Sequence, residues 1–456
     1  MRQWLAAVAA LLSGSVAAEM PGTQVTVQGL ATPQMFGAAG DGAVDDSTAV
    51  KAWLNSGRPL TCTGAFRVDS AVIASVGLGK GLHLQGRGRH LCRIILAERG
   101  RIQIDADVPT GRDLNANALH SAPQIVIRDL AIEPAYPMSA NQGPGPQSSA
   151  ALSITFPGAK TGNPGGWTDP MVLIDNLSIM PADAGKRAHI HYGLHLSNVS
   201  NADLSNITCE GFRGGPIVPG SACIVYEGDA APVDTRIRNA HAYFVETGIR
   251  LAGTWQGVHI LTPTIVAARF GVSASSSDND STLLEISGGE INVSDAPILI
   301  RNTTRTLIHD VHLNLIGTST QPDPACIKLG MSSPANSQFS IHDTICEAYQ
   351  STASSGFKYG VHISSALPPG MYRTSGFIHG NLLSNAGNRD DLFVPVHLGP
   401  GTSDVVVGCN DYRSARSVAG TIWNVENGNP GTNPALLNYL ACAPEPLATG
   451  ISAGGR

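Results

Sequence analysis

Charged and hydroxyl side chains recur at one position of a six-residue pattern that repeats through the middle of the chain. The pattern reads apolar, any, turn-forming, apolar, any, apolar, and its fifth position carries Ala131, Ser178, Thr208, His241, Thr264, Glu290, His312 and Ile345. A second polar row follows shortly after the pattern and carries Glu210, Glu246, Arg269, Asp295 and Glu347. If the repeats stack with their apolar side chains inward, both rows face outward on successive repeats.

The two rows hold the groups that hydrolysis of a glycosidic bond requires, namely one carboxyl group as acid and another as base or nucleophile. Stacked strands lie about 5 Å apart, so Glu246 and Asp295, two repeats apart, would be about 10 Å from each other. That separation is near the upper end of the range of roughly 6.5–9.5 Å typical of inverting enzymes. We predict four catalytic residues: Glu246, Glu290, Asp295 and His241.

Other side chains of the same repeats could hold a sugar chain, because cations pair with acidic sugars and aromatic rings stack on sugar rings. We predict four substrate-binding residues: Arg269, His312, Tyr243 and Trp255. A histidine base beside the cation Arg269 would also suit β-elimination of a uronate. Three structural interpretations remain open. His241 and His312 could be solvated strand residues. Arg269 could bridge Glu246 and Asp295 in a surface ion ladder, and the aromatic rings could cover the edge of a repeat.

The spacing of the pattern indicates a solenoid. It begins at Ile127, Ile174, Leu204, Ile237, Ile260, Ile286, Ile308 and Ile341, at intervals as short as 22 residues. The interval of 47 residues between Ile127 and Ile174 is interpreted as two units, with residues 152–156 as the missing one. The turn-forming third position allows left-handed backbone geometry, so each unit can bend at the same place.

These elements predict an all-β fold, a right-handed single-stranded parallel β-helix with a short N-terminal capping helix. One coil cannot bury its own apolar face, whereas stacked coils share a core and pair their backbones. Right-handed crossovers are strongly favoured between parallel strands. We place the β-helix at residues 59–410 and a C-terminal cap and tail at 411–456. An antiparallel sandwich is the alternative, but its strands would not repeat one register.

The N-terminal cover of the stack is expected within residues 19–58. Asp45 or Asp46 can cap a short helix whose Val50, Trp53 and Leu54 share one face. Its segment FGAAGDGAVDDSTAVKAWL resembles the opening signature of the pectate-lyase-3 superfamily, and PLTCTGAFRV at 59–68 is similar to the strand and turn that follow in that family. The resemblance implies a β-helix with an extended carbohydrate-binding face.

The resemblance does not specify an activity, because the superfamily includes hydrolases, lyases and proteins with no known activity. The residue set of its polygalacturonase-like members is absent, since His379-Gly380-Asn381 and Ile327-Lys328 are isolated fragments. Calcium-binding acids of ordinary pectate lyases are also not evident. Asp41, together with the two capping acids, is interpreted as a turn residue of the opening motif. Pectin is therefore not supported as the substrate.

The first residues predict export. Arg2 supplies a positive start, residues 5–12 form an apolar run, and residues 16–18 form a small-residue cleavage site. We predict a signal peptide at 1–18, with a membrane anchor as the alternative. Eight cysteines fit an oxidising compartment. None has zinc-site spacing, so we predict no metal and no cofactor. The predicted disulfides are Cys62–Cys92, Cys209–Cys223, Cys326–Cys346 and Cys409–Cys442.

Charge excludes one class of partner. The chain has 29 basic and 35 acidic residues, so it has no basic excess to neutralise nucleic-acid phosphates. No later apolar run reaches the roughly 18 residues of a membrane span. We expect a periplasmic or extracellular enzyme, a glycoside hydrolase that cleaves an acidic or microbial polysaccharide. A polysaccharide lyase or epimerase, and a non-catalytic glycan-binding β-helix, remain the alternatives. A homotrimer is compatible with the fold, although no sequence feature demands one.

Overall fold

The structure is a computed structural model of the chain. It describes residues 29–107, 123–138, 149–156, 172–182, 188–228, 232–276, 281–321, 323–331, 337–349, 358–365, 374–385, 393–399, 402–413 and 425–427. The predicted signal peptide and Cys442 lie outside the described residues.

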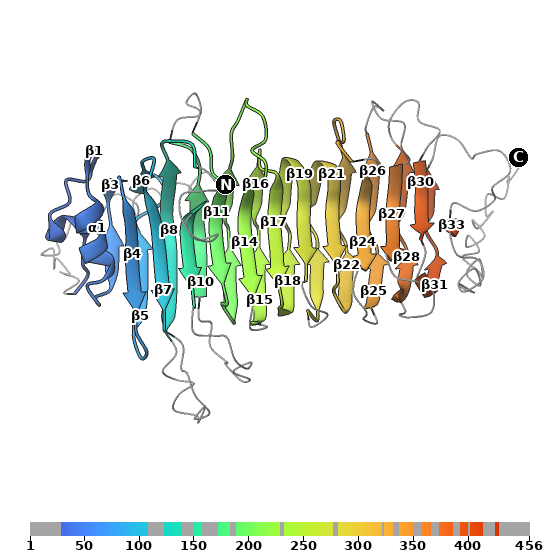
Figure 1. Cartoon of the computed structure of the whole chain (residues 1–456), viewed down its shortest axis with the longest axis horizontal. Helices are drawn as coiled ribbons and strands as arrows, with labels where there is room; N and C mark the ends of the chain where they lie inside the picture. Colours follow the sequence, from blue (N-terminus) through green and yellow to red (C-terminus); the bar gives the residue numbers. More distant parts are fainter. Residues whose placement is uncertain are drawn as a thin grey trace, which may run out of the picture. The chain divides into compact units, whose positions relative to one another are not determined.

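From Ala31 onward the chain forms a right-handed parallel β-helix whose coils stack side by side (Figure 1). Each full coil contributes strands to three faces, and every strand pairs in parallel with strands of the adjacent coils.

The first face contains β2 (Leu60–Cys62), β5 (Gly81–Gly86), β12 (Ala202–Ser205), β15 (Val233–Arg238), β18 (Gln256–Leu261), β20 (Leu284–Ser287), β22 (Arg305–His309), β25 (Ser337–His342), β28 (Thr374–His379) and β31 (Thr402–Gly408), together with the first halves of β8 (Gln124–Pro134) and β10 (Val172–Ile179). The second face contains β1 (Asp41–Asp45), β3 (Gly64–Val68), β6 (Cys92–Leu96), the second halves of β8 and β10, β13 (Thr208–Glu210), β16 (His241–Tyr243), the first halves of β19 (Thr264–Ser275) and β21 (Glu290–Arg301), β23 (His312–Leu315), β26 (Ile345–Ala348), β29 (Leu382–Asn385) and β32 (Asp411–Arg413).

The third face contains β4 (Ala71–Val76), β7 (Arg101–Ala106), β9 (Ala150–Thr155), β11 (Tyr192–Ser197), β14 (Ala222–Gly228), β17 (Thr247–Gly253), the second halves of β19 and β21, β24 (Ala325–Met331), β27 (Lys358–Ser365), β30 (Phe393–Leu398) and β33 (Val425–Asn427). The pairing of β29 with β32 and of β30 with β33 continues the stack into Asp411–Arg413 and Val425–Asn427.

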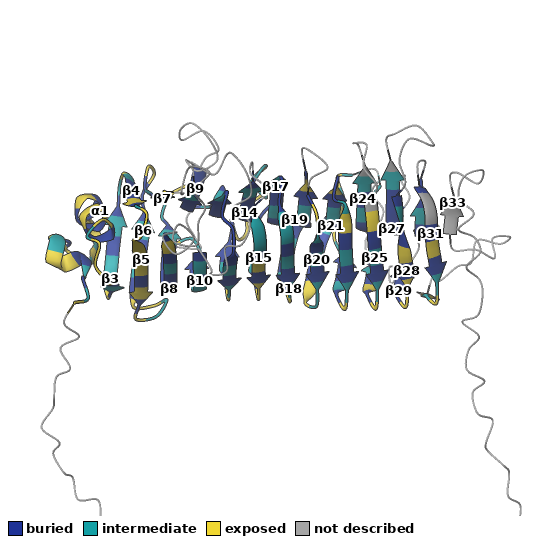
Figure 2. Cartoon of the chain, turned by 90° about the horizontal axis from the view of Figure 1, so that it is seen from below, coloured by how far each residue is buried: buried dark blue, intermediate teal, exposed yellow. Residues whose placement is uncertain are grey.

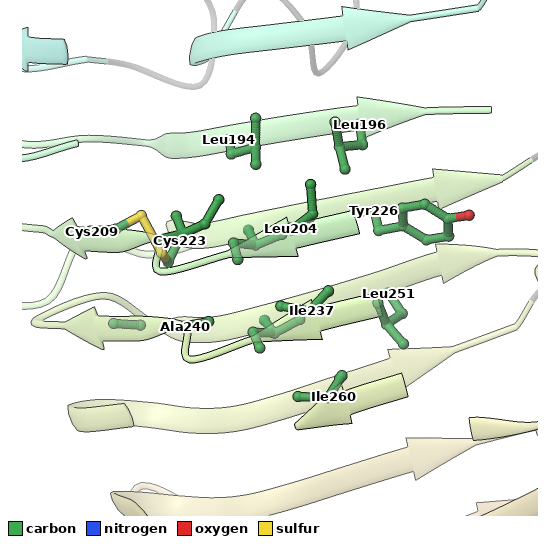
Figure 3. Close-up of a cluster of buried hydrophobic side chains, with 14 of the residues drawn as sticks. Leu194, Leu196, Leu204, Cys209, Cys223, Tyr226, Ile237, Ala240, Leu251 and Ile260 are labelled. Carbon is green, nitrogen blue, oxygen red and sulfur yellow. A yellow bond between two sulfur atoms is a disulfide. The ribbon is translucent and has the colours of Figure 1, made fainter. Parts of the chain in front are cut away.

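Apolar side chains of successive coils stack inside the helix. Leu204, Ile237 and Ile260 are direct partners on the first face, and each is fully buried (Figure 3). Buried and more exposed residues alternate along the strands, as the two-residue period of a strand requires (Figure 2). The repeating apolar positions of the sequence pattern therefore form one continuous core, as predicted.

The turn-forming position bends the backbone between the first and second faces. Its residues have positive φ angles of 51–64°: Asp129, Asn176, Asn206, Asn239, Thr262, Gly288, Asp310 and Asp343. Asparagine and aspartate tolerate this left-handed geometry because their side chains bond locally. The amide of Asn206 donates to Asp175, and that of Asn239 donates to Asn206, so the corner is also a hydrogen-bonded ladder.

The interval of 47 residues was wrongly interpreted as two units. Ile127 of β8 pairs directly with Ile174 of β10, so the interval is one coil. Leu152 lies on the third face, where it pairs with Ile102 and Leu194. Insertions that leave the strand register unchanged lengthen a coil without adding one.

The N-terminal end of the stack is covered as expected. The helix α1 (Ser47–Leu54) buries Val50 and Trp53 completely, and a 3-10 helix, η1 (Pro33–Phe36), precedes it. Asp46 is the N-cap residue, and its carboxylate accepts bonds from the backbone amides of residues 39 and 40. Asp45 accepts a bond from the amide of Ser47. These acids hold the opening turn.

Three of the predicted disulfides are confirmed, with Cα–Cα distances of 5.4 Å for Cys62–Cys92, 5.6 Å for Cys209–Cys223 and 6.0 Å for Cys326–Cys346. Such bridges are typical of proteins folded in an oxidising compartment. Cys409 is also disulfide-bonded, and its predicted partner is outside the described residues. Within the described part of the chain, no helix is long and apolar enough to cross a membrane.

Candidate functional site

The predicted fifth-position row exists on the second face. Register pairs join His241 to Thr264, Thr264 to Glu290 and Glu290 to His312 on consecutive coils. The side chains of this row are half-buried or exposed. We call these four residues the polar row. The polar row runs parallel to the axis of the helix. We call the outer surface that it shares with the neighbouring row on the same strands the track.

A second row lies two residues further along the same strands, on the same outer surface. Its consecutive members are Glu210, Tyr243, Val266, Asn292, Asn314 and Glu347. The predicted second row was therefore wrong in its membership. It combined two strand residues, Glu210 and Glu347, with three residues of the next corner.

The three corner residues form the ion ladder that the sequence left open. Arg269 donates from Nε to Asp295 (2.8 Å) and from Nη1 to Glu246 (2.5 Å). The side chain of Asp295 is fully buried. Each of its oxygens accepts two hydrogen bonds, the others coming from Ser319 and from the amide and hydroxyl of Thr320. A carboxylate with every acceptor site filled has no lone pair left for a water molecule or a sugar.

The ladder ties two connecting segments to the edge of the polar row. Glu246 accepts from the amide of Gly220, between β13 and β14, and its own amide donates to Ser221. Asp295 holds Ser319 and Thr320, which follow β23. The predicted catalytic residues Glu246 and Asp295 and the predicted substrate ligand Arg269 are therefore paired with one another and with these connecting segments beside the row.

The carboxylate of Glu347 contacts His312. Glu347 lies one coil beyond, and its Oε2 is 3.2 Å from Nε2 of His312 and 2.6 Å from the hydroxyl of Tyr349. The hydrogen bond from Tyr349 and then that from His312 lower the pKa of Glu347 against the opposing effect of burial. The same bond raises the pKa of Tyr349. Glu290, one coil before His312, has an exposed side chain.

Two amides of the second row lead to Glu290. Asn314 donates to Oδ1 of Asn292, and Asn292 donates to Oε1 of Glu290 at 2.7 Å. Asn314 is 6% exposed, and its Oδ1 is buried without a hydrogen-bond partner. A buried acceptor left unsatisfied is costly.

The remaining predicted residues fall in different places. His241 and Tyr243 lie half-buried at the start of the exposed track. Burial and then the nearby Arg89 lower the pKa of His241. Trp255 is fully buried in the core, so no face of its ring is presented to a sugar. Of the eight predicted residues, the structure places Glu290, His312, His241 and Tyr243 on the track.

Sequence reasoning missed Asn292 and Asn314, it considered Tyr349 only as a ring that could stack on sugars or cover a coil edge, and it gave no role to Glu347. The signal was available, since each lies two or four residues beyond the fifth position and thus points to the same side. It also missed a histidine stack at the corner, where the rings of His309 and His342 are 5.1 Å apart.

A serine–histidine–glutamate chain occupies the third face. The Oγ of Ser153 is 3.0 Å from Nδ1 of His195, whose Nε2 is 3.2 Å from Glu227. Ser153 is fully buried and His195 is 1% exposed. A substrate has no access to this hydroxyl, so we assign no catalytic role to Ser153, His195 and Glu227. No group of three or more potential ligands among the described residues is arranged to hold a metal ion.

Comparisons with known proteins show similar folds at low similarity. No family model matches the chain, and no curated protein does. The A-module of Azotobacter vinelandii mannuronan C-5 epimerase AlgE6 is 13% identical, with a TM-score of 0.39 over 87% of this chain and 98% of that one. The Streptococcus pneumoniae surface adhesin PfbA is 12% identical, with a TM-score of 0.41 over 87% and 90%.

The catalytic domain of a GH87 α-1,3-glucanase in complex with nigerose is 11% identical, with a TM-score of 0.36 over 86% of this chain and 67% of that one. The class of protein that the structure itself defines is the right-handed parallel β-helix. We infer no function from these similarities, and the particular activity has to be argued from the site.

Proposed function

We propose that the protein is a glycoside hydrolase that binds a polysaccharide along the second face and cleaves it between Glu290 and Glu347. The observation that supports this most directly is the contact of Glu347 with His312, one coil beyond the exposed Glu290. Glu290 is one coil before His312, whereas Glu347 leans back toward it from the next coil. In register Glu347 is two coils from Glu290, about 10 Å along the axis of the helix, and two residues further along its strand. The reach of the Glu347 side chain back to His312 brings the two carboxylates toward the range for inverting glycosidases.

In this proposal the two acids have different roles. Glu347, with its lowered pKa, is ionised at neutral pH and takes a proton from the attacking water. Glu290 donates its proton to the glycosidic oxygen as the bond from that oxygen to C1 breaks. Water forms the new bond to C1 from the opposite side, so the anomeric configuration inverts. His312 and Tyr349 orient Glu347, and Asn292 orients Glu290.

The other residues serve the same track. His241 and Tyr243 bind sugar units away from the cleaved bond. The ladder of Glu246, Arg269 and Asp295 fixes the neighbouring segments. The resemblance of residues 36–54 and 59–68 to the pectate-lyase-3 superfamily also supports a carbohydrate ligand, and export through residues 1–18 would place the enzyme where polysaccharides occur.

The test is digestion of a polysaccharide panel, followed by measurement of reducing ends and of absorbance near ~235 nm, where an unsaturated uronate produced by β-elimination absorbs. Reducing ends without absorbance are expected, and NMR of the first products should show the inverted anomer. Glu290→Gln and Glu347→Gln should each lower kcat at least about a hundredfold. The matched control Glu285→Gln, on the first face, should leave kcat within about twofold of wild type.

Absorbance without these losses would replace hydrolysis with elimination, for which His241 or His312 would be the base. A panel that binds but is never cleaved would leave a glycan-binding protein. Equal effects of the three glutamate substitutions would refute the assignment of the catalytic pair.

A further inference from the structure

The polar row is closed at one end. Register continues from His241 back to Thr208, Ser178 and Ala131 on the preceding coils. These positions also face outward, but Ser178 is 8% exposed and Ala131 is 5% exposed. The side chains of the row are thus accessible from His241 toward His312, and those on the coils that precede Thr208 are buried.

Arg89 marks the boundary. It belongs to the segment between β5 and β6, yet its Nη1 is 3.2 Å from the hydroxyl of Thr208, and its Nη2 donates to the carbonyl oxygen of Asn206. Because Arg93, at the start of β6, is three coils from Thr208 in register, the segment must cross the intervening coils to reach it. The guanidinium therefore stands at the end of the open track.

The charge of Arg89 has no carboxylate in direct contact among the described residues. Its Nε is buried without a hydrogen-bond partner. Asp175 and Asp129 act on it only at longer range, and burial lowers its pKa. A guanidinium that is partly desolvated and has unfilled donor capacity is suited to a carboxylate, which it can bind through two parallel hydrogen bonds.

Other side chains flank Thr208 on the side of β13 opposite to Arg89. The segment after β13 carries Phe212 and Arg213, and Arg213 is paired with Glu210 at 2.7 Å. Together with Met180 they line a cavity of about 110 Å³. Because Glu210 is on the same strand as Thr208, the track ends between Arg89 and these side chains.

We propose that Arg89 binds the carboxylate of the terminal sugar of an acidic polysaccharide, so that the enzyme releases short oligosaccharides of defined length from a chain end. This inference rests on the proposed function. Thr208 and His312 are four register steps apart, or about 19 Å. A pyranose unit is about as long as one step of roughly 4.8 Å, so three to four units fit between Arg89 and the cleaved bond.

The experiment compares the full chain with Arg89→Gln and Arg89→Lys, and with Arg87→Gln as the control in an exposed position of the same segment. Substrates are a uronate-containing polysaccharide that the enzyme cleaves and the same polymer with its carboxyl groups reduced to alcohols. Product length is followed by mass spectrometry and chain length by viscosity. Equal melting temperatures establish that each variant is folded.

Wild type should release products of about three to four units from the first minutes, with a slow fall in viscosity. Arg89→Gln should raise KM at least about tenfold, leave kcat within about twofold and broaden the product lengths. Arg89→Lys should fall between them, because it keeps the charge and loses the paired donors. On the reduced polymer, wild type and Arg89→Gln should have the same KM.

Random product lengths with a rapid fall in viscosity would overturn the inference while leaving hydrolysis intact. So would a KM for Arg89→Gln equal to that of Arg87→Gln, or a wild-type preference for the reduced polymer. No cleavage of any polysaccharide would instead refute the proposed function, and this inference with it.

Discussion

Replacing Arg269 by methionine tests the role of the ion ladder beside the proposed site. Methionine keeps much of the side-chain volume but removes three hydrogen bonds, to Asp295, Glu246 and Thr320. Asp295 would remain charged, fully buried and without its cation. Removing one partner of a buried ion pair costs about 3–5 kcal/mol.

The lower end of that range applies here. Asp295 keeps donors from Ser319 and Thr320, and the side chain of Glu246 is 17% exposed and can be solvated. We therefore expect Arg269→Met to lower the free energy of unfolding by about 3 kcal/mol. Adding Asp295→Asn should restore about 1 kcal/mol or more, because no buried charge then lacks a partner.

The assay combines urea unfolding with amide hydrogen exchange. The amides of Gly220 and Thr320 donate directly to the two acids, so the peptides that contain them should lose protection first. Arg236→Met is the control, because its pair with Asp234 is about half exposed on both sides and should cost no more than about 0.5 kcal/mol. Equal losses for Arg269→Met and Arg236→Met, or unchanged exchange at both amides, would refute the positioning role.

Three further predictions concern the stack. Replacing Cys326 and Cys346 by serine should destabilise the protein by about 3 kcal/mol, because the bridge closes a loop of 20 residues. The measurement is the urea midpoint of the variant against that of oxidised wild type, and an unchanged midpoint would contradict the prediction. Asn176→Ala should cost at least about 1 kcal/mol at a φ of 55°, whereas Asn176→Gly should cost less, and equal costs would contradict the left-handed turn. Burial opposes the charged forms of His309 and Glu285, but the hydrogen bonds of these two side chains have the larger effect. The pKa of His309 is therefore raised and that of Glu285 is lowered. The contribution of His309 to the free energy of unfolding is complete below about pH 6.5 and is lost as the pH rises through the pKa of His309 in the folded state. The contribution of Glu285 is complete above about pH 4.5 and is lost as the pH falls through the pKa of Glu285 in the folded state. His309→Gln should therefore lower the urea midpoint most between about pH 4.5 and 6.5, and a constant difference from pH 4 to 9 would contradict the ion pair.

The sequence was sufficient for the fold because the fold is periodic. An apolar residue at a fixed phase must point inward in every coil, so positions such as Ile174 and Ile237 could be placed without knowing any distant contact. The same phase correctly aligned His241, Thr264, Glu290 and His312 on one row. An insertion lengthens the coil between Ile127 and Ile174, and there the sequence wrongly predicted two coils where the structure has one.

The roles of the site residues depended on contacts that a periodic pattern does not encode. Whether Asp295 faces solvent or lies buried among four donors is decided by Thr320, which returns from a later coil. Burial of Trp255 and the reach of Arg89 to Thr208 likewise come from corners and connections, whose paths are set by packing rather than by strand phase. The sequence by itself therefore determined the helix, its inward and outward positions and the polar row. Only the tertiary structure decided which carboxylates are buried and paired and which surface position Arg89 reaches, because both depend on side chains brought together across coils.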